Sequence, residues 1–261
     1  MNKRNYISIL FALPIAAMLP VSALAQVVVS DTLTGATSTY PWTALTGACL
    51  TAGTASTKTG VGGNSYIPAC STLGYYSGKT QVGGVTGRIA PSPDPIGQGA
   101  LRLTNGDTTT GSNGNSQTGA VISTTPFPTN QGVQVTFSTA TYGGNAYGNA
   151  AGIPSGADGL AFFLLDGTQT PSIGSYGGSL GYSCSQNKSP GAGVNGGYLA
   201  VAIDEYGNFS NPGDATADGP GPTPGAIVVR GAGSITYAAL NALNSTYYPA
   251  GAADKITPVP L

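Results

Sequence analysis

Glycine and proline are so frequent in this chain that long helices are strongly disfavoured. The 261 residues include 41 Gly and 19 Pro, while charged residues make up only 7%, against about 25% in ordinary globular proteins. Gly and Pro are the two worst helix formers, and the Glu, Lys and Arg that favour helix surfaces are scarce. What remains is a surface of Ser, Thr, Asn and Gly over short runs of Val, Ile, Phe and Tyr, which is typical of all-β proteins.

Five segments carry the hydrophobic patterns of β-strands. Residues 99–106 and 132–139 alternate apolar and polar side chains, as half-buried strands do. Residues 159–166, "GLAFFLLD", are apolar on both faces, as expected for a strand that is covered on both sides. Residues 198–204 and 225–231 complete the set. These patterns argue against disorder of the whole chain, and they predict a two-sheet sandwich or jelly roll.

The first residues have the pattern of an export signal. Two basic residues precede an apolar segment at 7–19, and an Ala-Leu-Ala sequence ends at Ala25. This pattern predicts a signal peptide over residues 1–25 and a mature domain over residues 26–261. The apolar segment is shorter than the roughly 20 residues of a membrane-spanning helix. We therefore expect a secreted or cell-surface protein that does not insert into the membrane after cleavage.

The charged residues argue against several functional classes. The chain contains no His, so a Ser-His-Asp triad, a Cys-His dyad and the usual zinc sites cannot be built. The 9 Lys and Arg residues are spread along the chain and form no basic run for nucleic acid. The only Glu, Glu205, adjoins Asp204, and neighbouring side chains on a strand point to opposite faces. They cannot form the facing carboxylates of a glycosidase, and we expect no enzyme.

Three cysteines leave one without a partner inside the chain. Cys49 and Cys70 enclose a loop rich in Gly, Thr and Ser, and we expect a disulfide between them. Cys184 would then be free or paired with a residue beyond Leu261. All three cysteines have a structural interpretation, because no His is present to activate a thiolate.

One segment gathers oxygen donors at the end of a predicted strand. Residues 203–214, "IDEYGNFSNPGD", supply Asp204, a backbone carbonyl near Tyr206, the amide of Asn208 and then Asp214. Hard oxygen donors of this kind bind calcium. Asn, Asp and Gly are also ordinary turn residues, so the calcium site and the simple turn both stay open on spacing alone.

Three segments in the same order resemble the L-type, or legume-type, lectin domain. They are "ADGLAFFL" at 157–164, "GGSLGY" at 177–182 and "YLAVAIDEYGN" at 198–208. The resemblance covers roughly residues 99–234. It implies a concanavalin-like jelly roll of antiparallel sheets and calcium-dependent binding of glycans or polysaccharides without catalysis.

The resemblance also implies the site residues. The implied carbohydrate-binding residues are Asp158, Gly177, Gly178, Tyr206 and Asn208. Asp158 would follow a non-proline cis peptide bond after Ala157 and accept hydrogen bonds from two sugar hydroxyls, and the N–H of Gly178 would reach the same sugar. The implied calcium ligands are Asp204, the Tyr206 carbonyl, Asn208 and Asp214. The alternative for Asp158 is a turn aspartate that caps loop N–H groups.

The chain departs from the family pattern at the metal site. The family has a Glu two residues before the first aspartate, where this chain has Ala202, and it uses a His that this chain lacks. We therefore expect no transition metal. The second calcium aspartate of the family aligns with Gly213, so Asp214 is displaced by one residue.

The carboxyl end lacks the family's later strands. Only 27 residues follow Ser234, and we expect a jelly roll that is incomplete at its C-terminus, with a short helix at 237–244. The predicted function is a carbohydrate-binding module of a secreted or cell-surface adhesin. A structural sandwich without ligand, or a fragment of a glycoside hydrolase with the concanavalin fold, stays open as an alternative.

Overall fold

The structure is a computed structural model that describes most of the predicted domain. The described residues are 29–54, 67–72, 75–76, 80–81, 93–104, 117–129, 132–141, 147–148, 154–211, 219–233, 238–239 and 242. The predicted signal peptide at 1–25, Gly213 and Asp214 lie outside these ranges. Within 237–244, where a helix was expected, the three described residues are helical.

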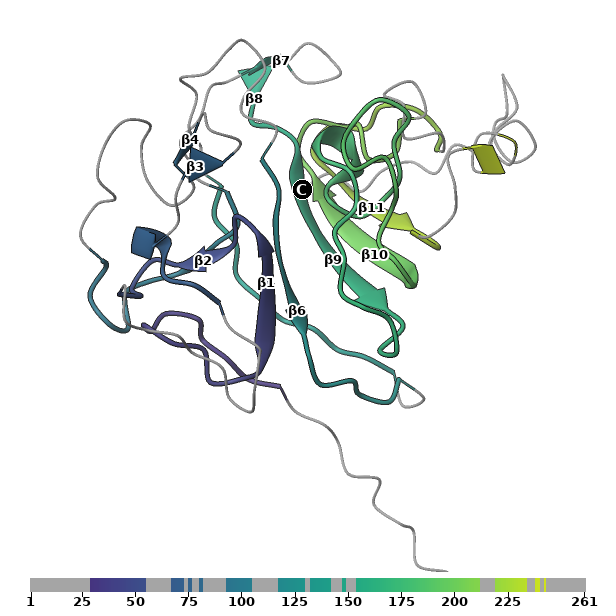
Figure 1. Ribbon diagram of the computed structural model, residues 1–261. Helices are drawn as coiled ribbons and strands as arrows, with labels where there is room; N and C mark the ends of the chain where they lie inside the picture. The colour runs from purple at the N-terminus through teal and green to yellow at the C-terminus, as the bar shows by residue number, and fades with distance from the viewer. Residues whose placement is uncertain are drawn as a thin grey trace, which may run out of the picture.

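Antiparallel strands make up nearly all the regular structure of the described residues, which confirms the all-β class (Figure 1). The strands are β1 Trp42–Thr46, β2 Cys49–Leu50, β3 Tyr75–Tyr76, β4 Thr80–Gln81, β5 Leu101–Arg102, β6 Gly119–Ser123, β7 Tyr147–Gly148, β8 Pro154–Ser155, β9 Gly159–Leu165, β10 Gly197–Asp204 and β11 Ala226–Arg230. Two single turns of 3-10 helix are present, η1 Cys70–Thr72 and η2 Gly177–Ser179. In the described part of the chain, no helix is long and apolar enough to cross a membrane.

The largest sheet has the order β11-β10-β9 and is antiparallel throughout. Its three strands confirm the predictions at 159–166, 198–204 and 225–231. Residue Ala202 of β10 pairs with Ala161 of β9 and with Val228 of β11, so the small side chains of the central strand lie in the middle of one face. β9 is half-buried along most of its length rather than fully covered, because this sheet packs closely on one face only.

Tyr182 lies at the centre of the core under this sheet. Tyr182 is fully buried with Val194 and Phe209 against Ala200 and Ala202 of β10. Its hydroxyl donates a hydrogen bond to the Gly231 carbonyl at 2.7 Å and accepts one from the Gly233 N–H at 3.1 Å. A buried phenol needs such partners. These two hydrogen bonds therefore hold the segment after β11 against the loop between β9 and β10 that contains Tyr182.

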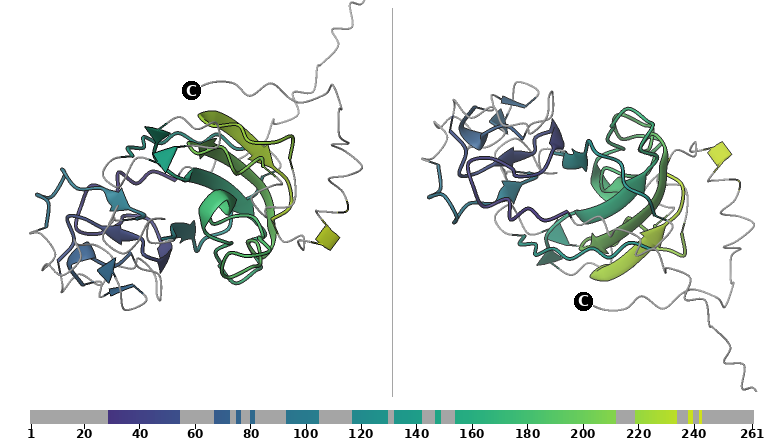
Figure 2. Two further views of the ribbon diagram at one scale, coloured as in Figure 1. Left: turned by 90° about the horizontal axis from the view of Figure 1, so that it is seen from above. Right: turned by 90° about the horizontal axis from the view of Figure 1, so that it is seen from below.

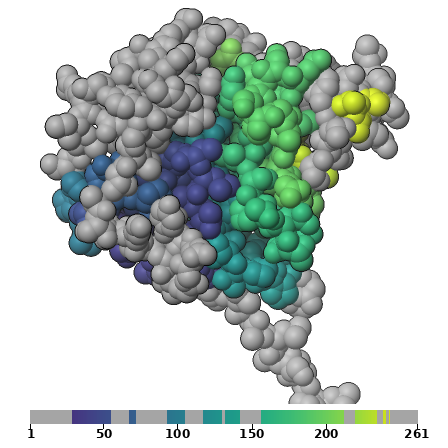
Figure 3. Space-filling view, in the orientation of Figure 1, coloured from purple at the N-terminus to yellow at the C-terminus, as the bar shows by residue number. Residues whose placement is uncertain are grey.

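The N-terminal strands form a second group beside the sheet. β1 pairs with β6, and β2 pairs with β5. The views in Figure 2 place these strands on one side and the green three-stranded sheet on the other. In Figure 3 the purple N-terminal residues border the green residues of the sheet. The predicted disulfide between Cys49 and Cys70 is present in this group, and Cys184 is buried and lies outside that bridge.

Two of the predicted strands differ from the structure. The segment 99–106 contains only the two-residue strand β5 among its described residues. The prediction at 132–139 is wrong, because no residue there belongs to a strand. Its apolar side chains are instead exposed, with Val133, Val135 and Phe137 at 41%, 45% and 51%. Alternation marks the two faces of a segment but does not supply a hydrogen-bonding partner.

Reduction of the disulfide should destabilise the N-terminal group. The bridge joins residues 21 positions apart, and closing a loop of that size in the unfolded chain contributes about 3 kcal/mol. We expect the Cys49→Ser/Cys70→Ser double variant to lose about this much unfolding free energy in urea titrations. As a control, thiol labelling of the denatured, unreduced wild type should modify Cys184 alone. Labelling at Cys49 or Cys70, or an unchanged unfolding free energy, would contradict this assignment.

Candidate glycan site at the start of β9

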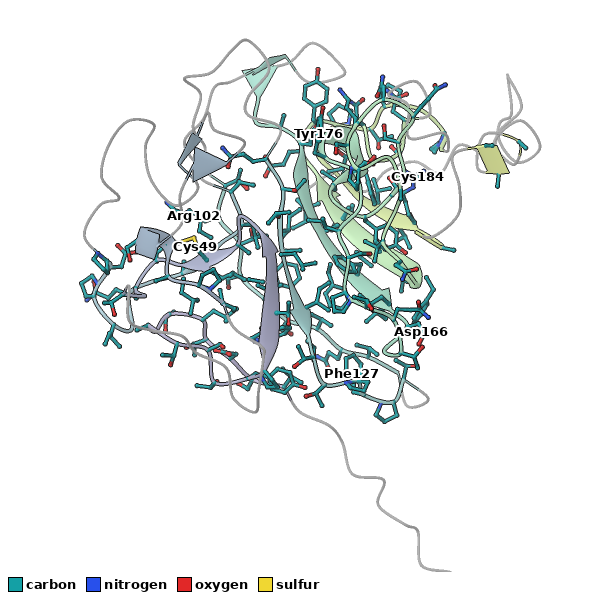
Figure 4. The ribbon with its side chains drawn as sticks, viewed as in Figure 1. Cys49, Arg102, Phe127, Asp166, Tyr176 and Cys184 are labelled. Atoms are coloured by element: carbon teal, nitrogen blue, oxygen red, sulfur yellow. A yellow bond between two sulfur atoms is a disulfide. The ribbon has the colours of Figure 1, made fainter. Side chains whose placement is uncertain are left out.

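Two aspartates meet where β9 begins and β10 ends. Asp158 immediately precedes β9, and Asp204 is the last residue of β10, paired with Gly159. The peptide bond between Ala157 and Asp158 is cis, as the resemblance implies. Figure 4 shows Tyr176 close to this end of β9 and Asp166 beyond the other end. Asp158 is half-buried, whereas Asp204 is fully buried.

The backbone of Asp158 ties two loops together. Its carbonyl accepts hydrogen bonds from the N–H groups of Glu205 and Tyr206, both at 3.1 Å. Gly159 follows with a φ of +142°, and a Cβ at this position would overlap the Ile203 carbonyl oxygen. Only glycine fits such a close approach. The C-terminal end of β10 therefore fixes the position of the Asp158 backbone, from which the carboxylate extends.

A turn of glycines lies next to the Asp158 carboxylate. Gly177 has a φ of +73°, and a Cβ built on it would lie 3.9 Å from Oδ2 of Asp158. Gly177 is half-buried, while its neighbour Gly178 is buried. Of the two glycines that the sequence singles out, Gly177 is therefore the more accessible one.

Two further side chains border this turn that the sequence analysis did not identify. The Cε atom of Lys188 lies 3.8 Å from the same Cβ position on Gly177, and its ammonium sits 5.8 Å from the centre of the Tyr176 ring. The hydroxyl of Ser175, which is fully buried, donates to the Lys188 carbonyl at 3.3 Å and so holds this loop. No motif marks Lys188, because its proximity depends on how the loop between 180 and 188 folds back.

The predicted carbohydrate-binding residues share one surface. A long, open hollow extends between the N-terminal strands and the three-stranded sheet, and all five line it together with Tyr176 and Lys188. The five residues are Asp158, Gly177, Gly178, Tyr206 and Asn208. They come from three chain segments. The hollow is much larger than one ligand, and within it the Gly177 turn lies beside the Asp158 carboxylate and the Lys188 side chain, whose ammonium lies near the Tyr176 ring.

Asp204 is held by the backbone that follows it. Its Oδ1 accepts a hydrogen bond from the Gly207 N–H and its Oδ2 from the Phe209 N–H, both at 2.8 Å. Burial raises the pKa of Asp204 to about 6, although the N–H groups of residues 207–210 oppose this rise. Ala202, where the family has a metal-binding Glu, is fully buried on the same face of β10.

The side-chain oxygens of two expected calcium ligands, Asp204 and Asn208, are engaged by protein donors in this structure. Both carboxylate oxygens of Asp204 face N–H donors. The side-chain oxygen of Asn208 accepts a hydrogen bond from Nδ2 of Asn211 at 2.9 Å. Within the described ranges, no group of three or more His, Cys, Asp or Glu residues could hold a metal, and Asp214 lies outside those ranges. A calcium ion would need six to eight oxygens turned toward it, whereas the described side-chain oxygens of Asp204 and Asn208 are turned to N–H donors.

Comparisons of the chain with protein-family models, curated proteins and solved structures found no significant match. The resemblance to L-type lectins consequently rests on the ordered sequence pattern. Function has to be argued from the geometry of the site itself.

The buried carboxylate of Asp204 should make stability depend on pH. A folded-state pKa of about 6, above the ordinary 3.8, gives a stabilising contribution that is complete below about pH 3.8 and is lost as the pH rises through about 6. The difference corresponds to at most about 3 kcal/mol. We expect the unfolding free energy of the wild type, relative to Asp204→Asn, to increase as the pH falls from 7 to 4.

Urea titrations of both proteins in EDTA across this range would measure the effect. Asp166→Asn is the matched control, because this aspartate also accepts a backbone N–H but is exposed. If the unfolding free energy of the wild type relative to Asp204→Asn instead decreases as the pH falls, the backbone hydrogen bonds lower the pKa of Asp204 more than burial raises it.

Proposed function

We propose that this chain is a carbohydrate-binding, lectin-like module of a secreted or cell-surface protein, and that it binds glycans without catalysis. In this proposal the fold is a concanavalin-like jelly roll, of which the three-stranded sheet is one part. Asp158 is the central ligand-binding residue. Gly177, Gly178, Tyr206 and Asn208 complete the site, and Tyr176 and Lys188 border it.

The observation that supports the proposal most is that two other loops meet at Asp158, one at its backbone carbonyl and one beside its carboxylate. The Asp158 carbonyl bonds to the N–H groups of Glu205 and Tyr206, and the Gly177 turn lies beside its Oδ2 atom. Glycine at 177 keeps the backbone accessible next to the carboxylate, where a side chain would enter the same space. A sugar ring could then approach both groups at once.

The chemistry of these groups suits a polyhydroxylated ligand. A carboxylate accepts hydrogen bonds from two neighbouring hydroxyls, and charge-assisted hydrogen bonds are the stronger kind. The rings of Tyr176 and Tyr206 offer apolar faces to the C–H side of a sugar ring.

Catalysis is not part of the proposal. The N–H of Glu205 bonds to the Asp158 carbonyl, but its side chain lies against Gly156, where a Cβ would be 2.9 Å from Oε2. Glu205 does not line the hollow. A glycosidase needs two carboxyl groups across one scissile bond.

Replacement of Asp158 should weaken binding strongly and leave the fold intact. On an array of neutral and acidic oligosaccharides, we expect Asp158→Ala to weaken binding at least tenfold, because a charged hydrogen-bond acceptor contributes about 1.5–3 kcal/mol. The melting temperature should change little, because the side chain is only half-buried and lines an open hollow.

Asp166→Ala is the matched control for this experiment. The two aspartates flank the same strand, eight residues and so about 26 Å apart at 3.3 Å per residue. The control should bind like the wild type. Binding that survives Asp158→Ala would refute the assigned site, and a wild type that retains no glycan would favour the structural module without ligand.

A further inference from the structure

The loop after β10, residues 204–210, folds around the carboxylate of Asp204. Asp204 is fully buried, and each of its oxygens accepts a backbone hydrogen bond at 2.8 Å from a residue further along this loop. The N–H groups of Asn208 and Ser210 also point to this carboxylate and oppose the rise of its pKa that burial causes. Successive N–H groups that point inward create a concave site for an anion, and the chain supplies that anion itself.

Three carbonyl oxygens of the loop accept hydrogen bonds from the segment 221–225. Those of Glu205, Gly207 and Ser210 accept hydrogen bonds from the N–H groups of Gly225, Thr223 and Gly221, at 3.3, 3.0 and 3.1 Å. A calcium loop would instead turn carbonyl oxygens toward the ion at 2.3–2.6 Å. The residues 221–225 thus hold the outer side of the loop with ordinary backbone hydrogen bonds.

Side chains complete the same closed network. The carbonyl of Phe209 accepts a hydrogen bond from Nη1 of Arg230 at 2.9 Å, and the Asn208 carbonyl accepts one from the Asn211 N–H at 3.1 Å. The hydroxyl of Ser210 donates to the Gly221 carbonyl at 2.9 Å. Of the six carbonyls from Glu205 to Ser210, five are therefore bonded to protein donors, and that of Tyr206, the one expected as a calcium ligand, is not among these five.

The position of a cation among these groups is unfavourable. Inward-pointing N–H groups present their positive ends to whatever occupies the centre of the loop. A calcium ion beside Asp204 would face these hydrogens and would have to displace several hydrogen bonds that are already formed. Each buried polar group left unpaired costs roughly as much as a lost hydrogen bond.

We infer that the 204–210 loop is held in shape by the Asp204 carboxylate and its backbone donors, and that ligand binding at the Asp158 site requires no calcium. The loop reaches the site through Glu205 and Tyr206, whose N–H groups hold the Asp158 carbonyl. A loop that keeps its shape in the absence of metal also keeps Asp158 in place. The part concerning ligand binding rests on the proposed function, whereas the part concerning the loop does not.

The thermal arm tests the loop itself. The purified mature protein is stripped with EDTA, and its thermal unfolding is compared in EDTA and in millimolar calcium chloride. We expect melting temperatures that agree within about 1 °C, because an ion that binds only the folded state would raise the midpoint by several degrees at saturation. Asp204→Asn should be destabilised equally in both buffers, and Asp166→Asn should behave like the wild type.

A saturable calcium-dependent rise of the wild-type melting temperature that is absent in Asp204→Asn would overturn the inference. If Asp204→Asn does not fold, a saturable rise in the wild type that persists in Asp166→Asn is enough to overturn it, and no rise supports it.

The glycan arm repeats the oligosaccharide array in EDTA and in calcium chloride. Equal retention in both buffers supports the inference, and retention lost in EDTA and restored by calcium overturns it. An array that retains no oligosaccharide in either buffer refutes the proposed function instead, and the thermal arm then decides the inference about the loop.

Discussion

The buried carboxylate of Asp204 is the interaction on which the site depends. It lies at the end of β10, where a strand must stop and its chain must turn without leaving backbone groups unpaired. It accepts hydrogen bonds from the N–H groups of Gly207 and Phe209. These bonds fix the turn and bring Phe209 into the core beside Tyr182. The same turn directs the N–H groups of Glu205 and Tyr206 to Asp158. One acidic side chain therefore connects the core of the sheet to the accessible loops.

Much of the sheet could be predicted from hydrophobic pattern because its strands carry strong signals. β9, β10 and β11 are continuous runs of Val, Ile, Leu, Ala and Phe between Gly-rich turns, and each was predicted to within two residues of its bounds. The disulfide between Cys49 and Cys70 was also predicted. By contrast, residues 132–139 show equally clear alternation yet belong to no strand. A strand requires a neighbouring backbone, and pattern within one segment contains no information about that neighbour.

The candidate site could be predicted in its residue types but not in its geometry. Asp158 and its cis peptide bond followed from the resemblance, whereas Lys188 and Tyr176 depend on a loop path that no motif encodes. Asp204 shows the ambiguity most clearly. A carboxylate can bind calcium or accept amide hydrogen bonds, and both roles suit Asp followed by Gly and Asn. Only the direction of the surrounding N–H and C=O groups distinguishes them.

We propose that the loops around Asp158 form a glycan site at the start of β9, and NMR can locate the bound sugar residue by residue. The ¹⁵N-labelled protein is titrated with an oligosaccharide retained on the array and followed by two-dimensional NMR. We expect saturable shifts confined to the amides of residues 156–159, 176–178 and 205–208. Saturable shifts that leave these amides unmoved and appear instead along β1 and β6 would contradict it.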